Sequence, residues 1–120
     1  MAKIETISSP KAKKALTFWH GVNTIALKRM PLDLTARQIS ILLHVYLNND
    51  THTVKKLSET LTMPKSAVCR AIDVLESAKL LKRISDKNDK RNVLINKTAK
   101  GTQYVNSFAD IIMLASKAAA

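Results

Sequence analysis

The segment "TMPKSAVCRAIDVLESAKLL", residues 62–81, carries polar side chains at a spacing that favours recognition rather than catalysis. Lys65, Ser66, Cys69 and Arg70 fall on one face of a helix when the apolar residues between them face inward. On an exposed helix Arg70 could donate bidentately to guanine, and Ser66 could bond base edges or phosphate. Lys65, at the start of the helix, would lie near phosphate.

A second cluster is "DKNDKR", residues 86–91, which lies between the β-like runs "LLKRIS" and "RNVLIN". A hairpin tip of mixed charge is most often a solvated turn. The helix-turn-helix pattern before it favours another interpretation, in which the cations meet a phosphate backbone or enter a narrow minor groove. The cations concerned are Lys87, Lys90 and Arg91.

The residues give no pattern for catalysis or metal binding. There is no Ser, His and acid constellation, phosphate-cradling glycine loop or carboxylate pair. His20, His44 and His52 are not spaced as metal ligands, so packing or surface roles are expected. The single cysteine, Cys69, allows no internal disulfide. The sequence therefore predicts a protein that is not an enzyme and has no cofactor or metal.

Charge is the strongest global feature, with 20 Lys and Arg against 9 Asp and Glu and a formal net charge of +11 in 120 residues. Such an excess favours a polyanionic partner, with nucleic acid first and an anionic membrane second. No apolar run approaches the length needed to span a bilayer, and the N-terminus lacks a signal-peptide core. We expect a cytoplasmic protein with no membrane partner.

Apolar periodicity predicts a mainly helical fold, which agrees with a content of only two glycines and three prolines. Thr35 with Gln38 fits a capping box, Thr53 and Thr98 fit helix caps, and Pro64 suits a first helical turn. Gly101 is expected to cost its helix about 1 kcal/mol relative to alanine. Helices are predicted over residues 11–30, 35–49, 53–61, 64–79 and 99–120, with a two-stranded hairpin over residues 80–96. This is the element order of a winged helix-turn-helix domain.

The two terminal helices have apolar faces wider than one stripe, which a chain of this size cannot easily cover alone. A second copy of the protein is a natural source of the missing surface. The candidate dimer-interface residues are Phe18, Trp19, Val22, Phe108, Ile111 and Ile112.

Four stretches together, "LTARQISILLHV", "VKKLSETLTMPKSAVCRAIDVLESAKLLKR", "DKNDKRNVLIN" and "TAKG", resemble the MarR family of bacterial transcription regulators. The resemblance runs from about Leu34 to Gly101. It implies a homodimer held by terminal helices, with each recognition helix in a major groove and each wing reaching a minor groove. In that family a small-molecule effector often binds between the dimer helices and the DNA-binding lobe, but no residue here identifies such a pocket. The chain is similar to the short, Sar-type members, which lack an extra C-terminal helix.

Carried over residue by residue, the resemblance places the family's recognition positions on the polar face described above, Lys65, Ser66, Cys69 and Arg70. It places the acid of the wing at Asp89 and the minor-groove arginine at Arg91. At the position of Cys69 the family commonly has a small hydroxyl residue, so one interpretation is that Cys69 is simply a small side chain that replaces it. The other interpretation is that nearby cations favour the thiolate and make Cys69 redox-sensitive. The sequence departs from the family pattern at Asn88, where arginine is frequent, and at Lys79, where a glycine usually ends the recognition helix.

These observations predict a mainly α-helical protein with a small two-stranded β-wing, in which residues 1–32 and 98–120 dimerise and residues 33–97 bind DNA. The predicted function is sequence-specific binding of double-stranded DNA at a pseudo-palindromic site by a homodimeric transcription regulator, a repressor or an activator. The alternative is an architectural, nucleoid-associated protein with little sequence preference.

Overall fold

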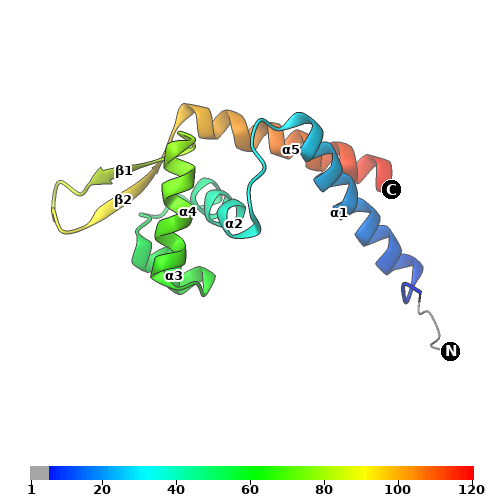
Figure 1. Cartoon of the computed structure of the whole chain (residues 1–120), viewed down its shortest axis with the longest axis horizontal. Coiled ribbons are helices and arrows are strands. Elements are labelled where there is room, and N and C mark those ends of the chain that lie inside the picture. The colour runs from blue at the N-terminus through cyan, green and yellow to red at the C-terminus, as the bar shows by residue number, and fades with distance from the viewer. Residues whose placement is uncertain (1–5) are drawn as a thin grey trace. The chain divides into compact units, whose positions relative to one another are not determined.

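The computed structural model describes residues 6–120 and has the expected order of helices and strands (Figure 1). Five helices and one antiparallel pair of strands form a mainly helical protein with a β-wing, as the sequence predicts. The elements are α1 (Pro10–Arg29), α2 (Ala36–Leu47), α3 (Val54–Leu61), α4 (Lys65–Ser77), β1 (Leu81–Ser85), β2 (Val93–Lys97) and α5 (Ala99–Ala119).

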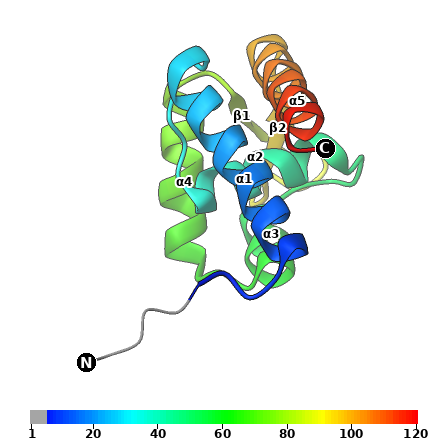
Figure 2. The same cartoon turned by 90° about the vertical axis from the view of Figure 1, so that its right-hand side faces the viewer.

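The chain divides into two compact units. One contains α1 and the C-terminal part of α5, from Ser107 onward. The other, Leu34–Asn106, contains α2, α3, α4, the two strands and the first turns of α5 (Figures 1 and 2). We call the second unit the winged-helix unit.

Side-chain caps fix where most of the helices begin. Thr35 accepts from the Gln38 amide while the Gln38 side chain accepts from the Thr35 amide, which confirms the capping box. The Thr53 hydroxyl accepts from the Lys56 amide at the start of α3, and the Thr98 hydroxyl accepts from the Gly101 amide at the start of α5. Pro64 is the N-cap of α4 rather than a residue of its first turn, so that prediction was wrong by one position.

The core of the winged-helix unit is a continuous apolar cluster shared by α2, α3, α4 and the wing. Burial of each such side chain stabilises the folded state by roughly 1.5–3 kcal/mol. The inward positions of these helices are therefore apolar, which gives the sequence its regular helical spacing of apolar residues here. The side chains that are at most 1% exposed are Ile41, Leu42, Val45, Leu57, Val68, Ile72, Leu75, Leu80, Leu81 and Ile95.

The wing is a short antiparallel ladder that is attached to the core at its base. Leu81 pairs with Lys97, and Arg83 lies opposite Ile95. The amide of Ile95 also donates to the carbonyl of His52, in the segment before α3. At the tip, Asp86 and Asn92 close the turn through a hydrogen bond from the Asp86 amide.

Tyr46 joins three segments of the winged-helix unit. Its hydroxyl donates to the Leu80 carbonyl at 2.7 Å and accepts from the Thr98 amide at 3.1 Å. A Cβ at position 101 would overlap this hydroxyl and the Leu80 carbonyl oxygen, and would lie 2.7 Å from Tyr46 Cζ. The structure adds a reason for glycine at this position beyond its expected cost to the helix, because a larger residue cannot fit without moving Tyr46.

Helix α4 ends in a Schellman motif at Lys79, the position where the family that the sequence resembles usually has glycine. Lys79 has a φ of 64°, its amide donates to the Glu76 carbonyl, and the Leu80 amide donates to the Leu75 carbonyl. Thr62, in the turn between α3 and α4, is also left-handed, with a φ of 52°. Both residues carry a Cβ in a conformation that costs L-residues about 1–2 kcal/mol.

In the unit formed by the terminal helices, Val22, Phe108 and Ile111 are already buried within the chain, and Phe18 and Ile112 are half-buried. Trp19 is 57% exposed. Other exposed apolar side chains of this unit are Leu16, Leu27, Met113 and Leu114. No helix within residues 6–120 has the length and apolar character needed to cross a membrane.

Candidate nucleic-acid interface

Helix α4 presents the polar face that the sequence predicts. Lys65, Ser66 and Arg70 are exposed, and Cys69 is half-buried between them. The opposite face, with Val68 and Ile72 among its residues, is buried against the core. Because the apolar face fixes the rotation of the helix, the polar side chains can only face outward.

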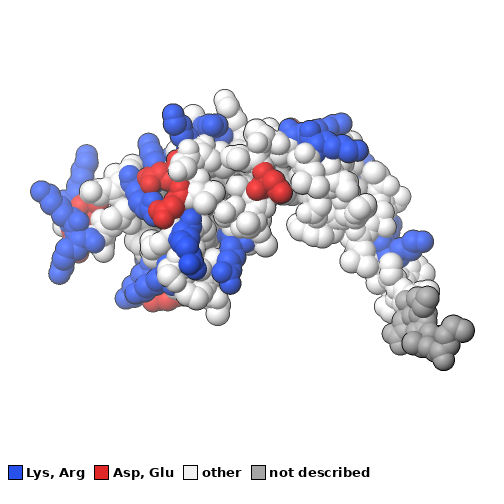
Figure 3. Space-filling model, in the orientation of Figure 1, with Lys and Arg blue, Asp and Glu red and all other residues white. Residues whose placement is uncertain are grey.

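The tip of the wing presents cations on a solvated turn. Lys87 and Lys90 are exposed, and the Arg91 side chain is 91% exposed. Arg91 donates through Nε to Asp89 Oδ1 at 3.1 Å, and its amide donates to the same oxygen. These side-chain and backbone hydrogen bonds lower the pKa of Asp89. Figure 3 shows the blue side chains gathered at this end of the winged-helix unit.

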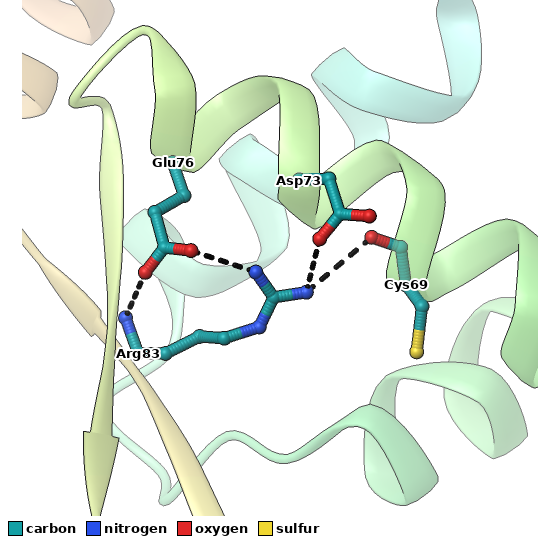
Figure 4. Close-up of polar contacts among 4 residues, drawn as sticks. All are labelled: Cys69, Asp73, Glu76 and Arg83. Atoms are coloured by element: carbon teal, nitrogen blue, oxygen red, sulfur yellow. Dashed lines mark hydrogen bonds and ion pairs between the residues drawn. The ribbon is translucent and has the colours of Figure 1, made fainter.

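Arg83, on β1, connects the wing to the recognition helix (Figure 4). Its Nη1 donates to Glu76 Oε1 at 2.7 Å, and its backbone amide donates to the other Glu76 oxygen at 3.0 Å. Its Nη2 donates to Asp73 Oδ1 at 2.7 Å and reaches the Cys69 carbonyl at 3.4 Å. One guanidinium therefore holds three successive turns of α4 against the first strand of the wing.

The electrostatics of this link follow from its geometry. Hydrogen bonds from the Arg83 backbone and then from its side chain lower the pKa of Glu76. Partial burial lowers the pKa of Arg83, but the bonds to Glu76 and Asp73 outweigh that effect and raise it above its ordinary value. Glu76 lies in the last turn of α4, where the helix dipole disfavours a carboxylate, so Arg83 also removes a local repulsion.

Sequence reasoning missed Arg83 as an interface residue, although a signal was present. Arg83 pairs with Ile95 and so occupies the face of the wing that carries buried residues. A cation at an inward position of a strand requires a carboxylate nearby, since an unpaired buried charge is costly. The acids at helical spacing in α4, Asp73 and Glu76, were available to satisfy it.

A groove of about 830 Å³ lies between α3, the start of α4 and the wing. It brings together Lys65 and Arg91, which the sequence assigned separately to the recognition helix and the wing. It also adds Lys55 and Lys56 from the first turn of α3, which the sequence reasoning did not select. Their signal was weak, because two adjacent lysines at the start of a short helix normally indicate only a solvated face.

Within residues 6–120 no three His, Cys, Asp or Glu side chains are arranged to hold a metal ion. His44 and His52 do meet, with ring centroids 5.5 Å apart, and Asn48 bonds to both. His52 is buried, so it has the packing role expected of it. Cys69 is a free thiol.

The sequence of residues 32–92 matches the model of the MarR family. The chain belongs to the MarR family. The match covers half of the protein, from the residues before α2 to the tip of the wing, and includes both parts of the candidate interface.

Solved structures of MarR-family regulators have the same fold. A mutant of MepR from S. aureus, bound to an oligodeoxyribonucleotide, is 22% identical with a TM-score of 0.82, and the match covers 96% of this chain and 82% of the MepR chain. MarR from E. coli in its apo form is 23% identical with a TM-score of 0.66, and the match covers 92% of this chain and 78% of MarR. The transcriptional regulator BldR from Sulfolobus solfataricus is 25% identical with a TM-score of 0.63, and the match covers 86% of this chain and 70% of BldR. Comparison with curated protein sequences found no significant match.

Proposed function

We propose that this MarR-family protein is a transcription regulator that binds a pseudo-palindromic site in double-stranded DNA as a homodimer. Helix α4 enters the major groove, and the wing enters the adjacent minor groove. Residues 33–97 bind DNA, and residues 1–32 and 98–120 form the dimer. The protein acts in the cytoplasm as a repressor or activator and has no catalytic role.

The observation that carries this proposal is the pairing of two exposed polar surfaces within one compact unit. The exposed face of α4 offers the donors that read bases in a major groove, and an α-helix fits that groove. The wing offers three cations at a solvated tip, and a narrow minor groove has strong negative potential. Arg83 fixes the two surfaces relative to each other.

The dimer is supported by the apolar surface that α1 and α5 leave exposed. Trp19 is the only tryptophan of the chain and is more than half exposed, as are Leu16 and Met113. We expect sedimentation equilibrium to give twice the 13.3 kDa mass of the chain. Substitution Trp19→Ser should shift the equilibrium toward monomer while the far-UV spectrum is retained. A monomeric wild type at micromolar concentration would contradict the dimer.

The function is tested by selecting bound sequences from a random duplex pool at near-physiological salt, followed by titration of the selected site against scrambled DNA. A regulator should recover a two-fold related motif with half-sites about one helical turn apart. Its preference for that motif should be roughly a thousandfold or more. Recovery of unenriched DNA at similar affinity would instead favour the architectural alternative.

Arg70 gives a residue-level test of the same proposal. Substitution Arg70→Ala should weaken binding to the selected site by about 1–3 kcal/mol and relax the preference at one base pair. Arg29→Ala removes the same charge from the last turn of α1 and serves as the matched control. Equal weakening on selected and scrambled DNA would remove Arg70 from base recognition.

A further inference from the structure

A second hollow lies at the base of the wing, within the winged-helix unit. Its volume is about 360 Å³, which falls within the range of small-molecule sites, roughly 300–1,000 Å³. Its walls come from the end of α2, residues 48–52 and the two strands, and among residues 6–120 no part of α1 or α5 lines it. It also shares no lining residue with the groove beside α3. We call it the wing-base hollow.

Hydrogen bonds within the protein hold the walls of the wing-base hollow in place. The backbone carbonyl of Asn48 accepts from His52 Nε2 at 2.9 Å. The carbonyl of His52 accepts in turn from the amide of Ile95 on β2 at 2.9 Å. Across the hollow, Lys97 Nζ donates to Asn49 Oδ1 at 3.4 Å. The hollow is therefore formed in the free protein, and a ligand would not have to order its walls.

His52 gives the wing-base hollow a hydrogen-bond acceptor. Because the Asn48 carbonyl can only accept, His52 Nε2 carries the proton, and Nδ1 of the neutral ring is an acceptor. No fully buried side-chain nitrogen or oxygen within residues 6–120 lacks a partner. Nδ1 makes no hydrogen bond in that part of the chain, so it reaches solvent although the residue is only 6% exposed. The ring lines the hollow, where a hydroxyl group could donate to Nδ1.

Two lysines make the wing-base hollow cationic. Lys82 of β1 and Lys97 of β2 both line it, and within residues 6–120 neither enters an ion pair. Asp50 lines the hollow as well but pairs with neither lysine. The carboxamides of Asn49 and Asn96 add donors and acceptors to the wall. Ammonium groups beside carboxamides and an imidazole acceptor suit an anionic group that carries hydroxyl groups next to it.

We propose that the wing-base hollow binds a small hydroxylated anion, a metabolite with a phosphate or carboxylate group. The anionic group lies between Lys82 and Lys97, and its hydroxyl groups face His52 and the carboxamides. This site is separate from the position between the dimer helices and the DNA-binding lobe where effectors often bind in the MarR family. The inference does not rest on the proposed function, because binding of such an anion is measured without DNA.

Isothermal titration calorimetry of the full chain at low ionic strength tests the site. The probes are glycerol 3-phosphate and malate, which carry a hydroxyl group beside a phosphate and beside carboxylates, respectively. Lys82→Gln with Lys97→Gln removes both charges from the hollow. Lys87→Gln with Lys90→Gln removes the same charge from the tip of the wing, outside the hollow, and is the matched control. Asp50→Asn, which removes the opposing charge, is the third variant.

We expect saturable binding of at least one probe, and the better ligand identifies the anionic group as phosphate or carboxylate. The hollow variant should bind about tenfold or more weakly, since it loses two charge-assisted contacts, while the wing-tip control binds as the wild type does. Asp50→Asn should bind roughly two- to fivefold more tightly, a gain that misfolding cannot produce.

Three outcomes would overturn the inference. Neither probe may bind saturably to the wild type, or the hollow and wing-tip variants may lose affinity alike. In the third outcome the hollow variant weakens duplex binding but leaves probe binding unchanged, which would assign Lys82 and Lys97 to DNA. The proposed function stands or falls separately, on the selection of duplex sites.

Discussion

Substitution Gly101→Ala should destabilise the protein, although alanine is the better helix former. Gly101 lies in the first turn of α5, against the hydroxyl by which Tyr46 holds the Leu80 carbonyl and the Thr98 amide. The new methyl group would overlap the hydroxyl and the Leu80 carbonyl oxygen. The tyrosine must move and its hydrogen bonds must break. The backbone must also shift, because the Leu80 carbonyl oxygen overlaps the new Cβ independently of the tyrosine.

The expected loss can be worked out from these contacts. Overpacking a filled site costs about 1–3 kcal/mol. Loss of the tyrosine hydrogen bond contributes roughly 0.5–1.5 kcal/mol more. The higher helix propensity of alanine returns about 1 kcal/mol. The net decrease in the free energy of unfolding is therefore about 0.5–3.5 kcal/mol.

Urea unfolding followed by far-UV circular dichroism measures this difference. Gly21→Ala is the matched control, because a Cβ at position 21 would lie 3.5 Å from the Ala115 Cβ, an ordinary contact. The control should gain about 0.5–1 kcal/mol from reduced backbone entropy. In a Tyr46→Phe background Gly101→Ala should cost less, since the hydroxyl is gone. If Gly101→Ala is as stable as the control, Tyr46 does not constrain α5 and the explanation is refuted.

Two further substitutions test how α4 ends and how it is held to the wing. Lys79→Gly should raise the free energy of unfolding by about 0.5–1 kcal/mol, because glycine adopts the left-handed φ of the Schellman motif without strain; an unchanged urea midpoint would contradict this. Arg83→Met should lower stability near neutral pH, since it keeps the apolar stem but loses the ion pairs. The folded-state pKa of Glu76 is lowered. The ion pair with Arg83 therefore stabilises the folded protein fully above the ordinary glutamate pKa of about 4.3, and this stabilisation disappears as pH falls through the folded-state pKa. Unfolding curves of both proteins should therefore converge in acid, and a constant difference down to pH 2 would contradict the link.

The helices, their caps and the wing could be predicted because they depend on nearby residues. A capping box needs only Thr35 and Gln38, three positions apart, and the buried stripe of a helix repeats every three or four residues. The amphipathic face of α4 follows from the same periodicity. That is why Lys65 and Arg70 were found on the exposed side without any knowledge of the tertiary structure.

The relations that the sequence did not reveal all join segments that are distant along the chain. Tyr46 is 34 residues from Leu80, whose carbonyl it bonds, so nothing local shows why position 101 must be glycine. Likewise, Lys55 follows an ordinary helix cap, and its place beside the wing depends on how α3 packs against α4. Periodicity determines which face of an element is buried, but not which other element it meets.

The link from Arg83 to α4 gives the candidate interface its main physical advantage. If the wing moved freely relative to α4, DNA binding would have to order both, and each immobilised flexible side chain alone costs about 0.5–1.5 kcal/mol. Arg83 holds the wing to α4 through Asp73 and Glu76, so under the proposed function the spacing between these two elements is set before DNA arrives. The groove between α3, the start of α4 and the wing is bounded by these same two elements. Under the proposed function the carboxylates of α4 would therefore contribute to recognition indirectly, even though their charge alone would repel phosphate.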